Sequence, residues 1–176
     1  MSASMTHSTD PRTALLNRFA DGGPLLVQAC SNLTPEQCTS YPIPGTWSLA
    51  ELAGHLLDSD LVFADRMKRI IAEEAPVLQA FDEQAWIKNL PANEMPVDEA
   101  VALFAANRRW MDRILRGLDE SAFARTGTHT EKGRQTLTEV LVYATNHLDH
   151  HLKFLYAKRA ALGVSIYPRY TSNSGV

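Results

Sequence analysis

Hydrophobic positions along this 176-residue chain recur at spacings of three and four, which is the period of an amphipathic helix. Four stretches show this pattern: residues 13–31, 49–74, 97–117 and 137–163. The second contains a stripe of apolar side chains at Leu49, Leu52, Leu56, Phe63, Met67 and Ile70, and the fourth contains one at Leu141, Leu148, Leu152 and Leu155. No alternating pattern typical of strands competes with them. The chain is therefore predicted to be an all-α four-helix bundle, with a long connection between the second and third helices.

The predicted helix ends follow from capping residues and from proline and glycine. Ser48 with Glu51, and Thr136 with Glu139, match the capping box, in which each side chain satisfies a backbone donor of the first turn. Pro76 predicts that the second helix stops near residue 74, because proline disfavours helix in the residue before it. The Gly22-Gly23-Pro24 stretch interrupts the first helix and predicts either a kink or a later start.

The remaining segments are predicted to be connections and chain ends. Within residues 76–96, FDEQAW predicts a short turn of helix and LPANEMP a loop, and short extended pieces are expected around residues 126–130. Residues 1–11 are predicted to be a disordered N-terminal tail, residues 12–165 a single bundle domain, and residues 166–176 a C-terminal tail, in which YPRYTSNSGV, residues 167–176, is expected to be frayed.

Composition and charge exclude several classes of function. The formal net charge of −3 gives no broad basic surface, so nucleic-acid binding is disfavoured. No segment approaches the roughly 20 apolar residues that cross a bilayer, and MSASMTHSTD lacks the apolar run of a signal peptide. Cys30 and Cys38 form no disulfide framework or C-x-x-C motif, which is typical of reduced thiols. We expect a cytoplasmic protein with a small-molecule partner, and a homodimer is compatible with the sequence.

Three of the six histidines fall within NHLDHHLKFL, residues 146–155. At about 100° per residue, His147 and His151 share one face of the helix, one turn apart, while His150 points roughly 100° away from His151. The pair lies on the flank of the leucine stripe, and His55 occupies the same kind of flank on the second helix. Periodicity does not show that the two flanks meet, so chance and a polar face remain alternatives to a metal site.

A divalent-metal site would need histidine nitrogens from both helices that converge on one ion. Histidines at i and i+4 can present two nitrogens to one ion, and a third from a facing helix completes three corners of a tetrahedral or octahedral site with positions left open. Glu51 and Asp58, one turn either side of His55, could act as a general base or orient that imidazole.

The other histidines and the tryptophans have simpler interpretations. His150 is predicted to face solvent, His129 to hold its own loop, and His7 to belong to the tail. The three tryptophans are predicted to be core residues rather than a substrate cage: Trp47, Trp86 and Trp110.

Two separate motifs carry a resemblance to a known family. TWSLAELAGHL at residues 46–56 and NHLDHH at residues 146–151 together resemble the DinB/YfiT-like superfamily, and RTGTHTEKGRQTLTEVLVY resembles the segment that leads into its last helix. The resemblance covers residues 14–162. It implies a four-helix bundle with a three-histidine divalent-metal site, whose matching positions here are His55, His147 and His151.

The activity implied by this resemblance is less specific. The superfamily includes enzymes that use low-molecular-weight thiols, such as bacillithiol S-transferases and mycothiol-dependent maleylpyruvate isomerases, and many members without an assigned reaction. A metal-dependent thiol S-transferase is slightly preferred here, with a metal-dependent hydrolase and a non-catalytic metal-binding stress-response protein as alternatives. Zinc, nickel and iron all suit three imidazoles with open positions. An ordinary imidazole pKa of about 6.5 predicts that metal affinity falls between pH 7 and pH 5.

Overall fold

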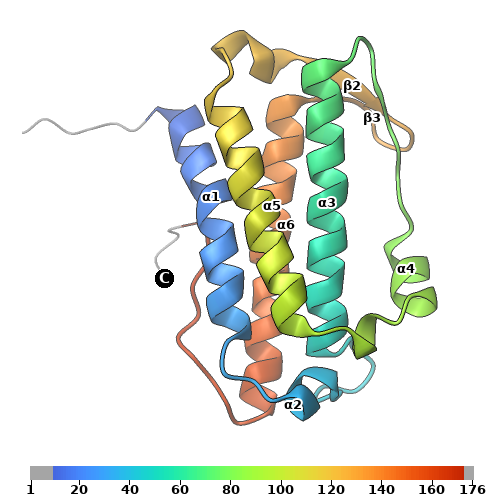
Figure 1. Cartoon of the computed structure of the whole chain (residues 1–176), viewed down its shortest axis with the longest axis vertical. Coiled ribbons are helices and arrows are strands. Elements are labelled where there is room, and N and C mark those ends of the chain that lie inside the picture. The colour runs from blue at the N-terminus through green and yellow to red at the C-terminus, as the bar shows by residue number, and fades with distance from the viewer. Residues whose placement is uncertain (1–9, 173–176) are drawn as a thin grey trace, which may run out of the picture.

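Four long helices form an elongated bundle in the computed structural model, which describes residues 10–172 (Figure 1). They are α1 (Pro11–Cys30), α3 (Leu49–Ala72), α5 (Val97–Arg116) and α6 (Leu137–Ala161). The helices α1 and α3 each pack against both α5 and α6. The predicted all-α four-helix bundle is confirmed. His7 lies outside the described residues.

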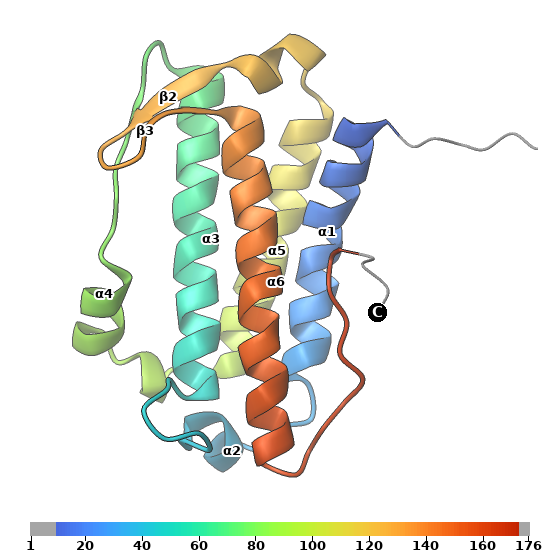
Figure 2. The same cartoon turned by 180° about the vertical axis from the view of Figure 1, so that it is seen from behind.

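The connection between α3 and α5 runs the length of the bundle on its outside (Figure 1). It contains β1 (Val77–Leu78), α4 (Glu83–Asn89) and the 3-10 turn η1 (Ala92–Glu94). Because the connection returns the chain to the end where α3 began, α3 and α5 run in the same direction, whereas α3 and α6 run in opposite directions (Figure 2). The short helical turn predicted from FDEQAW corresponds to the start of α4.

Smaller elements close the two ends of the bundle. Helix α2 (Pro35–Thr39) lies between α1 and α3, and η2 (Glu120–Ala124) follows α5. The strand β1 pairs in parallel with β2 (Thr126–His129), which pairs antiparallel with β3 (Gly133–Thr136). This three-stranded sheet covers the end where α3 stops and α6 starts (Figure 1).

Both predicted capping boxes are present at the starts of α3 and α6. Glu51 N–H donates to Ser48 Oγ at 3.0 Å while Glu51 Oε2 accepts from Ser48 N–H at 2.7 Å. Thr136 and Glu139 make the same reciprocal pair. These caps fix the first turn of the two helices that carry the clustered histidines.

The first helix begins before its glycines and continues through Pro24, so the predicted later start is wrong. Packing explains the glycines. A Cβ on Gly22 would lie 2.6 Å from Arg108 Nη1, and one on Gly23 would lie 3.2 Å from Ala105 Cα. Because Gly22 and Gly23 have no side chains, α1 can approach α5 closely at these two positions.

The bundle core consists of two apolar clusters. One lies toward α2 and includes Leu26, Leu52, Leu56, Phe104, Leu148 and Leu152, and the other lies toward the sheet and includes Phe19, Phe63, Met67, Met111, Leu137 and Leu141. The predicted stripes of the second and fourth helices are buried throughout. Burial at about 25 cal/mol per Å² of apolar surface is the main stabilising contribution of these clusters.

A buried ion pair joins α3 to α5. Arg108 is 1% exposed, and its Nε donates to Asp60 Oδ1 at 2.6 Å. Its other nitrogens donate to the carbonyls of Ala144 and Phe19, at 2.9 and 3.3 Å. Asn107 Nδ2 donates to Asp60 Oδ2 at 2.7 Å. The guanidinium is thereby hydrogen-bonded to three other elements, as a buried charge requires.

Two tryptophans predicted as core residues are not buried. Trp110 is 60% exposed on α5, and Trp86 is 37% exposed on α4, where it packs against Phe81. Arg108 and Met111 occupy the inward face of α5, and Trp110 lies about 100° around the helix from Met111. The charged Arg108 is therefore buried in the core and the apolar Trp110 is exposed, which is the reverse of what hydrophobicity alone predicts.

The segment after α6 is held against the bundle up to residue 172. It turns back and runs beside α6 and α1 (Figure 2). Asp149 accepts hydrogen bonds from Thr171 N–H at 2.7 Å and from Thr171 Oγ1 at 2.8 Å. Fraying from residue 167 is therefore wrong as far as Ser172. Among the helices of residues 10–172, none is both long and apolar enough to cross a membrane.

Candidate metal centre

The structure brings His55 of α3 together with His147 and His151 of α6. Their three Nε2 atoms lie 3.3 Å (His55 to His147), 3.2 Å (His55 to His151) and 3.1 Å (His147 to His151) apart. Packing of the Leu56 stripe against the Leu148–Leu152 stripe turns the flanks of the two helices toward each other. The three residues converge as one group of three potential metal-binding side chains.

The spacing of the three nitrogens suits a common ligand position. Zinc–nitrogen bonds of about 2.0–2.1 Å, at tetrahedral or octahedral angles, place neighbouring nitrogens about 2.9–3.4 Å apart. The observed spacings fall within this range. A neutral imidazole can carry its single proton on Nδ1, which leaves the Nε2 lone pair free to bind an ion. The donor set therefore fits a divalent metal ion.

Burial keeps all three imidazoles neutral at pH 7. Desolvation lowers the pKa of His55 to about 4. Desolvation is also the main cause that lowers the pKa of His151 to about 3 and that of His147 to about 2, and the charges of neighbouring histidines contribute in the same direction. Neutral imidazole is the form that binds metal, so the centre is ready for an ion without releasing protons. The expected loss of affinity between pH 7 and pH 5 rested on an ordinary imidazole pKa of about 6.5, so the lowered pKa values move that loss to lower pH.

Aromatic side chains surround the three histidine rings. The Trp47 ring lies 4.9 Å from the His55 ring and is stacked 6.4 Å from the His151 ring. Phe63 meets the His147 ring edge-on at 5.5 Å. Trp47 also packs against the core, so it contacts the site as well as the interior. These contacts restrict the rotation of the imidazoles.

The remaining described histidines lie outside this cluster. His150 is exposed, and its ring lies 5.1 Å from that of His151. His129 Nδ1 accepts from the backbone N–H groups of Glu131 and Lys132, at 3.1 and 3.2 Å, which confirms that it holds its own loop. The rotation argument from the sequence thus separated His150 correctly from the pair.

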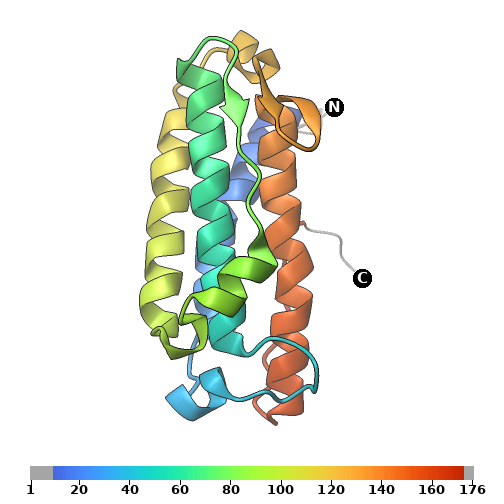
Figure 3. The same ribbon diagram turned by 90° about the vertical axis from the view of Figure 1, so that its right-hand side faces the viewer.

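The carboxylates near His55 differ from those proposed from the sequence. Glu51 accepts from Ser48 N–H and from Tyr41 Oη, so it caps α3 instead of acting on His55. Burial raises the pKa of Asp58, but no hydrogen bond joins it to the three histidines in the described structure. Glu83 of α4 instead places its Oε2 3.8 Å from His55 Nε2. Helix α4 lies across the outside of α3 and α6 (Figure 3). The sequence had indicated only a helical turn there.

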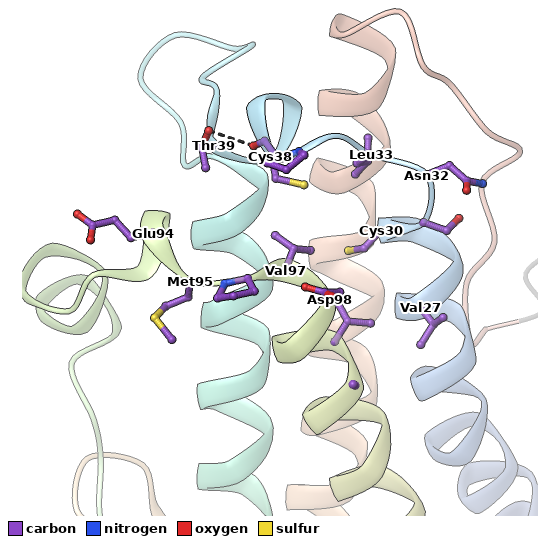
Figure 4. A pocket seen from close by; sticks show the side chains of 15 residues that line it. Val27, Cys30, Asn32, Leu33, Cys38, Thr39, Glu94, Met95, Val97 and Asp98 are labelled. Carbon is purple, nitrogen blue, oxygen red and sulfur yellow. Dashed lines mark hydrogen bonds between the residues drawn. The ribbon is translucent and has the colours of Figure 1, made fainter.

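A separate cavity of about 730 Å³ lies where α1 ends and α5 begins, beneath α2 (Figure 4). Cys30 and Cys38 line it together with Val27, Met95 and Val97. Burial raises the pKa of Cys30 to about 12, so its thiol is a poor nucleophile. None of the three clustered histidines lines this cavity, and the histidine centre remains the candidate for catalysis.

Comparisons with known proteins identify the family and the fold of the chain. The family model described as the DinB superfamily matches residues 19–155. A protein of Oceanobacillus iheyensis, provisionally named a metal-dependent hydrolase, is 30% identical over 138 residues, covering 78% of this chain and 79% of its own. The structure of YfiT from Bacillus subtilis superposes on this chain with a TM-score of 0.82 and 23% sequence identity. The match covers 94% of this chain and 95% of YfiT, which is provisionally described as a metal-dependent hydrolase with an unusual four-helix bundle topology. An Exiguobacterium sibiricum protein assigned to the DinB family gives 0.61 at 25% identity, covering 90% and 96%.

Proposed function

This chain belongs to the DinB superfamily, and from that premise we propose that it is a metal-dependent hydrolase of a small-molecule substrate, with His55, His147 and His151 holding a divalent ion. The observation that carries the proposal is the convergence of three neutral Nε2 atoms within 3.1–3.3 Å of one another. The provisional names of the relatives support a hydrolase in particular.

The residues of the centre would hold the ion, orient its ligands and leave it accessible. Three uncharged ligands leave a divalent cation its full charge. When bound, such an ion supplies a Lewis acid that lowers the pKa of water or of a thiol. Trp47 and Phe63 hold the imidazole rings in orientation, and His147 and His151 are only partly buried, which leaves the centre accessible from outside the bundle.

The surroundings of the centre support a substrate with an apolar part. Tyr143 and Phe154 are 46% and 47% exposed, and their rings lie 6.0 Å from those of His147 and His151, respectively. Exposed aromatic rings beside a reactive centre offer apolar contact area to a ligand. A thiol could occupy the same side, so thiol transfer, which the family resemblance implies, stays a prediction.

Metal identity and reaction class can be tested together. The protein is purified without nickel chromatography, its metal content is measured, and the metal-free form is reloaded separately with zinc, nickel or ferrous iron. Each form is assayed against a panel of small esters and amides, with and without added low-molecular-weight thiol. Metal-dependent turnover without thiol, lost in His147→Ala, supports the hydrolase. Turnover only with thiol replaces it with the transferase, and full metal occupancy without turnover favours a binding protein.

A further inference from the structure

Glu83 is the acidic side chain that faces the histidine centre from outside the bundle. Its Oε2 lies 3.8 Å from His55 Nε2, although the two residues belong to different elements, α4 and α3. The side chain of His55 is 1% exposed, whereas that of Glu83 is 48% exposed. Glu83 therefore approaches the centre from the solvent side.

The position of Glu83 is set by anchors on either side of α4. Before the helix, Ala80 N–H donates to Thr130 Oγ1 at 3.0 Å. After it, Asn93 Oδ1 accepts from Ser48 Oγ at 2.6 Å. Asp82 caps the first turn by accepting from Ala85 N–H at 3.0 Å. None of the residues of α4 is buried, so the connection holds the helix in place without a core of its own.

The charges at this position favour a cation. Glu83 Oε2 lies 3.8 Å from His55 Nε2, which is beyond the reach of a direct hydrogen bond. When each imidazole carries its proton on Nδ1, the three Nε2 lone pairs and the Glu83 carboxylate face one region as hydrogen-bond acceptors. Such an arrangement is unfavourable unless a positive charge or a proton donor lies among them.

We propose that Glu83 is the fourth protein group of this centre, a carboxylate that strengthens binding of the divalent ion and accepts a hydrogen bond from the ligand on the open side. This inference rests on the proposed function. A spacing of 3.8 Å exceeds the roughly 2.9–3.4 Å between two atoms that bind one ion side by side. Glu83 thus belongs beyond the three ligands, where its negative charge would act on a bound ion and its oxygen would accept a hydrogen bond from the ligand.

The experiment measures metal affinity instead of turnover. Zinc and cobalt dissociation constants are determined with a competing chelator for the full-length wild type, Glu83→Gln and Glu83→Lys. Glu94→Gln and Glu94→Lys provide the matched controls, since Glu94 lies on the same connection but lines the separate cavity. We expect affinity to fall by about tenfold in Glu83→Gln and further in Glu83→Lys, following the charge. The two Glu94 variants should stay within about twofold of wild type.

A second measurement guards against indirect effects. The visible absorption of the cobalt-loaded protein reports the ligands on the open side and should change in Glu83→Gln. The melting temperature of each metal-free variant should match that of the wild type, because α4 contributes no buried residue. If the wild type binds metal and Glu83→Gln retains both its affinity and its spectrum, the role of Glu83 is wrong. If the wild type itself binds no metal, the proposed function fails instead.

Discussion

His55 Nε2 lies 3.2 Å from His151 Nε2, although the two residues stand 96 positions apart and belong to helices that run in opposite directions. His150, the immediate neighbour of His151, is exposed and is not one of the three clustered histidines. Adjacent histidines of one helix thus have different surroundings, and this difference can be tested directly.

Replacing any of the three convergent histidines should abolish tight metal binding. We expect His55→Ala, His147→Ala and His151→Ala each to weaken zinc affinity more than about hundredfold, because even residues that only orient a ligand contribute about 10–100-fold. His150→Ala is the matched control and should bind like the wild type. Isothermal titration calorimetry measures each constant. Loss of the ion in His150→Ala together with its retention in His147→Ala would show that the ligand assignment is wrong.

Metal should stabilise the fold without being needed for it. An ion that binds only the folded state adds about 2.7 kcal/mol at a hundredfold excess over its dissociation constant. The metal-free protein should still unfold cooperatively, since both apolar clusters are complete without the ion. Thermal unfolding followed by circular dichroism, with and without zinc, measures the difference. A metal-free chain that is unfolded under mild conditions would indicate a structural site and contradict the catalytic proposal.

The lowered pKa values of the histidines predict how pH affects the metal-free protein. The unfolded chain has ordinary imidazoles with pKa values of about 6.5, whereas those of His55 and His151 in the folded state are about 4 and 3. Above pH 6.5 neither state is protonated, and stability is complete. As pH falls below 6.5 the unfolded state takes up protons that the folded state does not, so the free energy of unfolding falls, by up to about 1.4 kcal/mol per pH unit for each histidine. The loss continues until pH passes below the folded values.

Urea unfolding of the metal-free protein at pH 7, 6 and 5 measures this slope. His147→Ala should show a shallower slope than wild type, because it removes one of the three buried imidazoles. The zinc affinity of the folded protein should remain nearly constant from pH 7 to pH 5 and weaken only toward pH 4. A steep loss of affinity near pH 6.5 would mean that the histidines are more hydrated than their burial indicates.

Two helical glycines should respond oppositely to alanine. At Gly22 the new Cβ would lie 2.6 Å from Arg108 Nη1 and 2.7 Å from Leu148 Cδ2, and Arg108 is held by its own hydrogen bonds. We expect Gly22→Ala to destabilise the protein by about 1–3 kcal/mol through overpacking. At Gly54 the nearest neighbour is Ala92 Cβ at 3.8 Å, an ordinary contact, so Gly54→Ala should stabilise α3 by up to about 1 kcal/mol. Denaturant midpoints of both variants test the contrast, and a stabilised Gly22→Ala would contradict it.

The sequence by itself determined the features that depend on neighbouring residues. The spacing of Leu49, Leu52 and Leu56 set the buried face of α3, and the Ser48–Glu51 pair set where that helix starts. The i, i+4 spacing of His147 and His151 placed both on one face of α6, since helix geometry fixes that relation locally.

Only the tertiary structure decided which faces meet and which charges are buried. Periodicity gives each helix an inward face but does not say which neighbour it contacts, so the approach of His55 to His147 depended on the packing of two distant segments. The burial of Arg108 depended on Asp60 and on the backbone carbonyls of two other helices, and no local pattern records those partners. Glu83 reaches the centre because contacts on either side of α4 fix a connection that has no hydrophobic periodicity of its own.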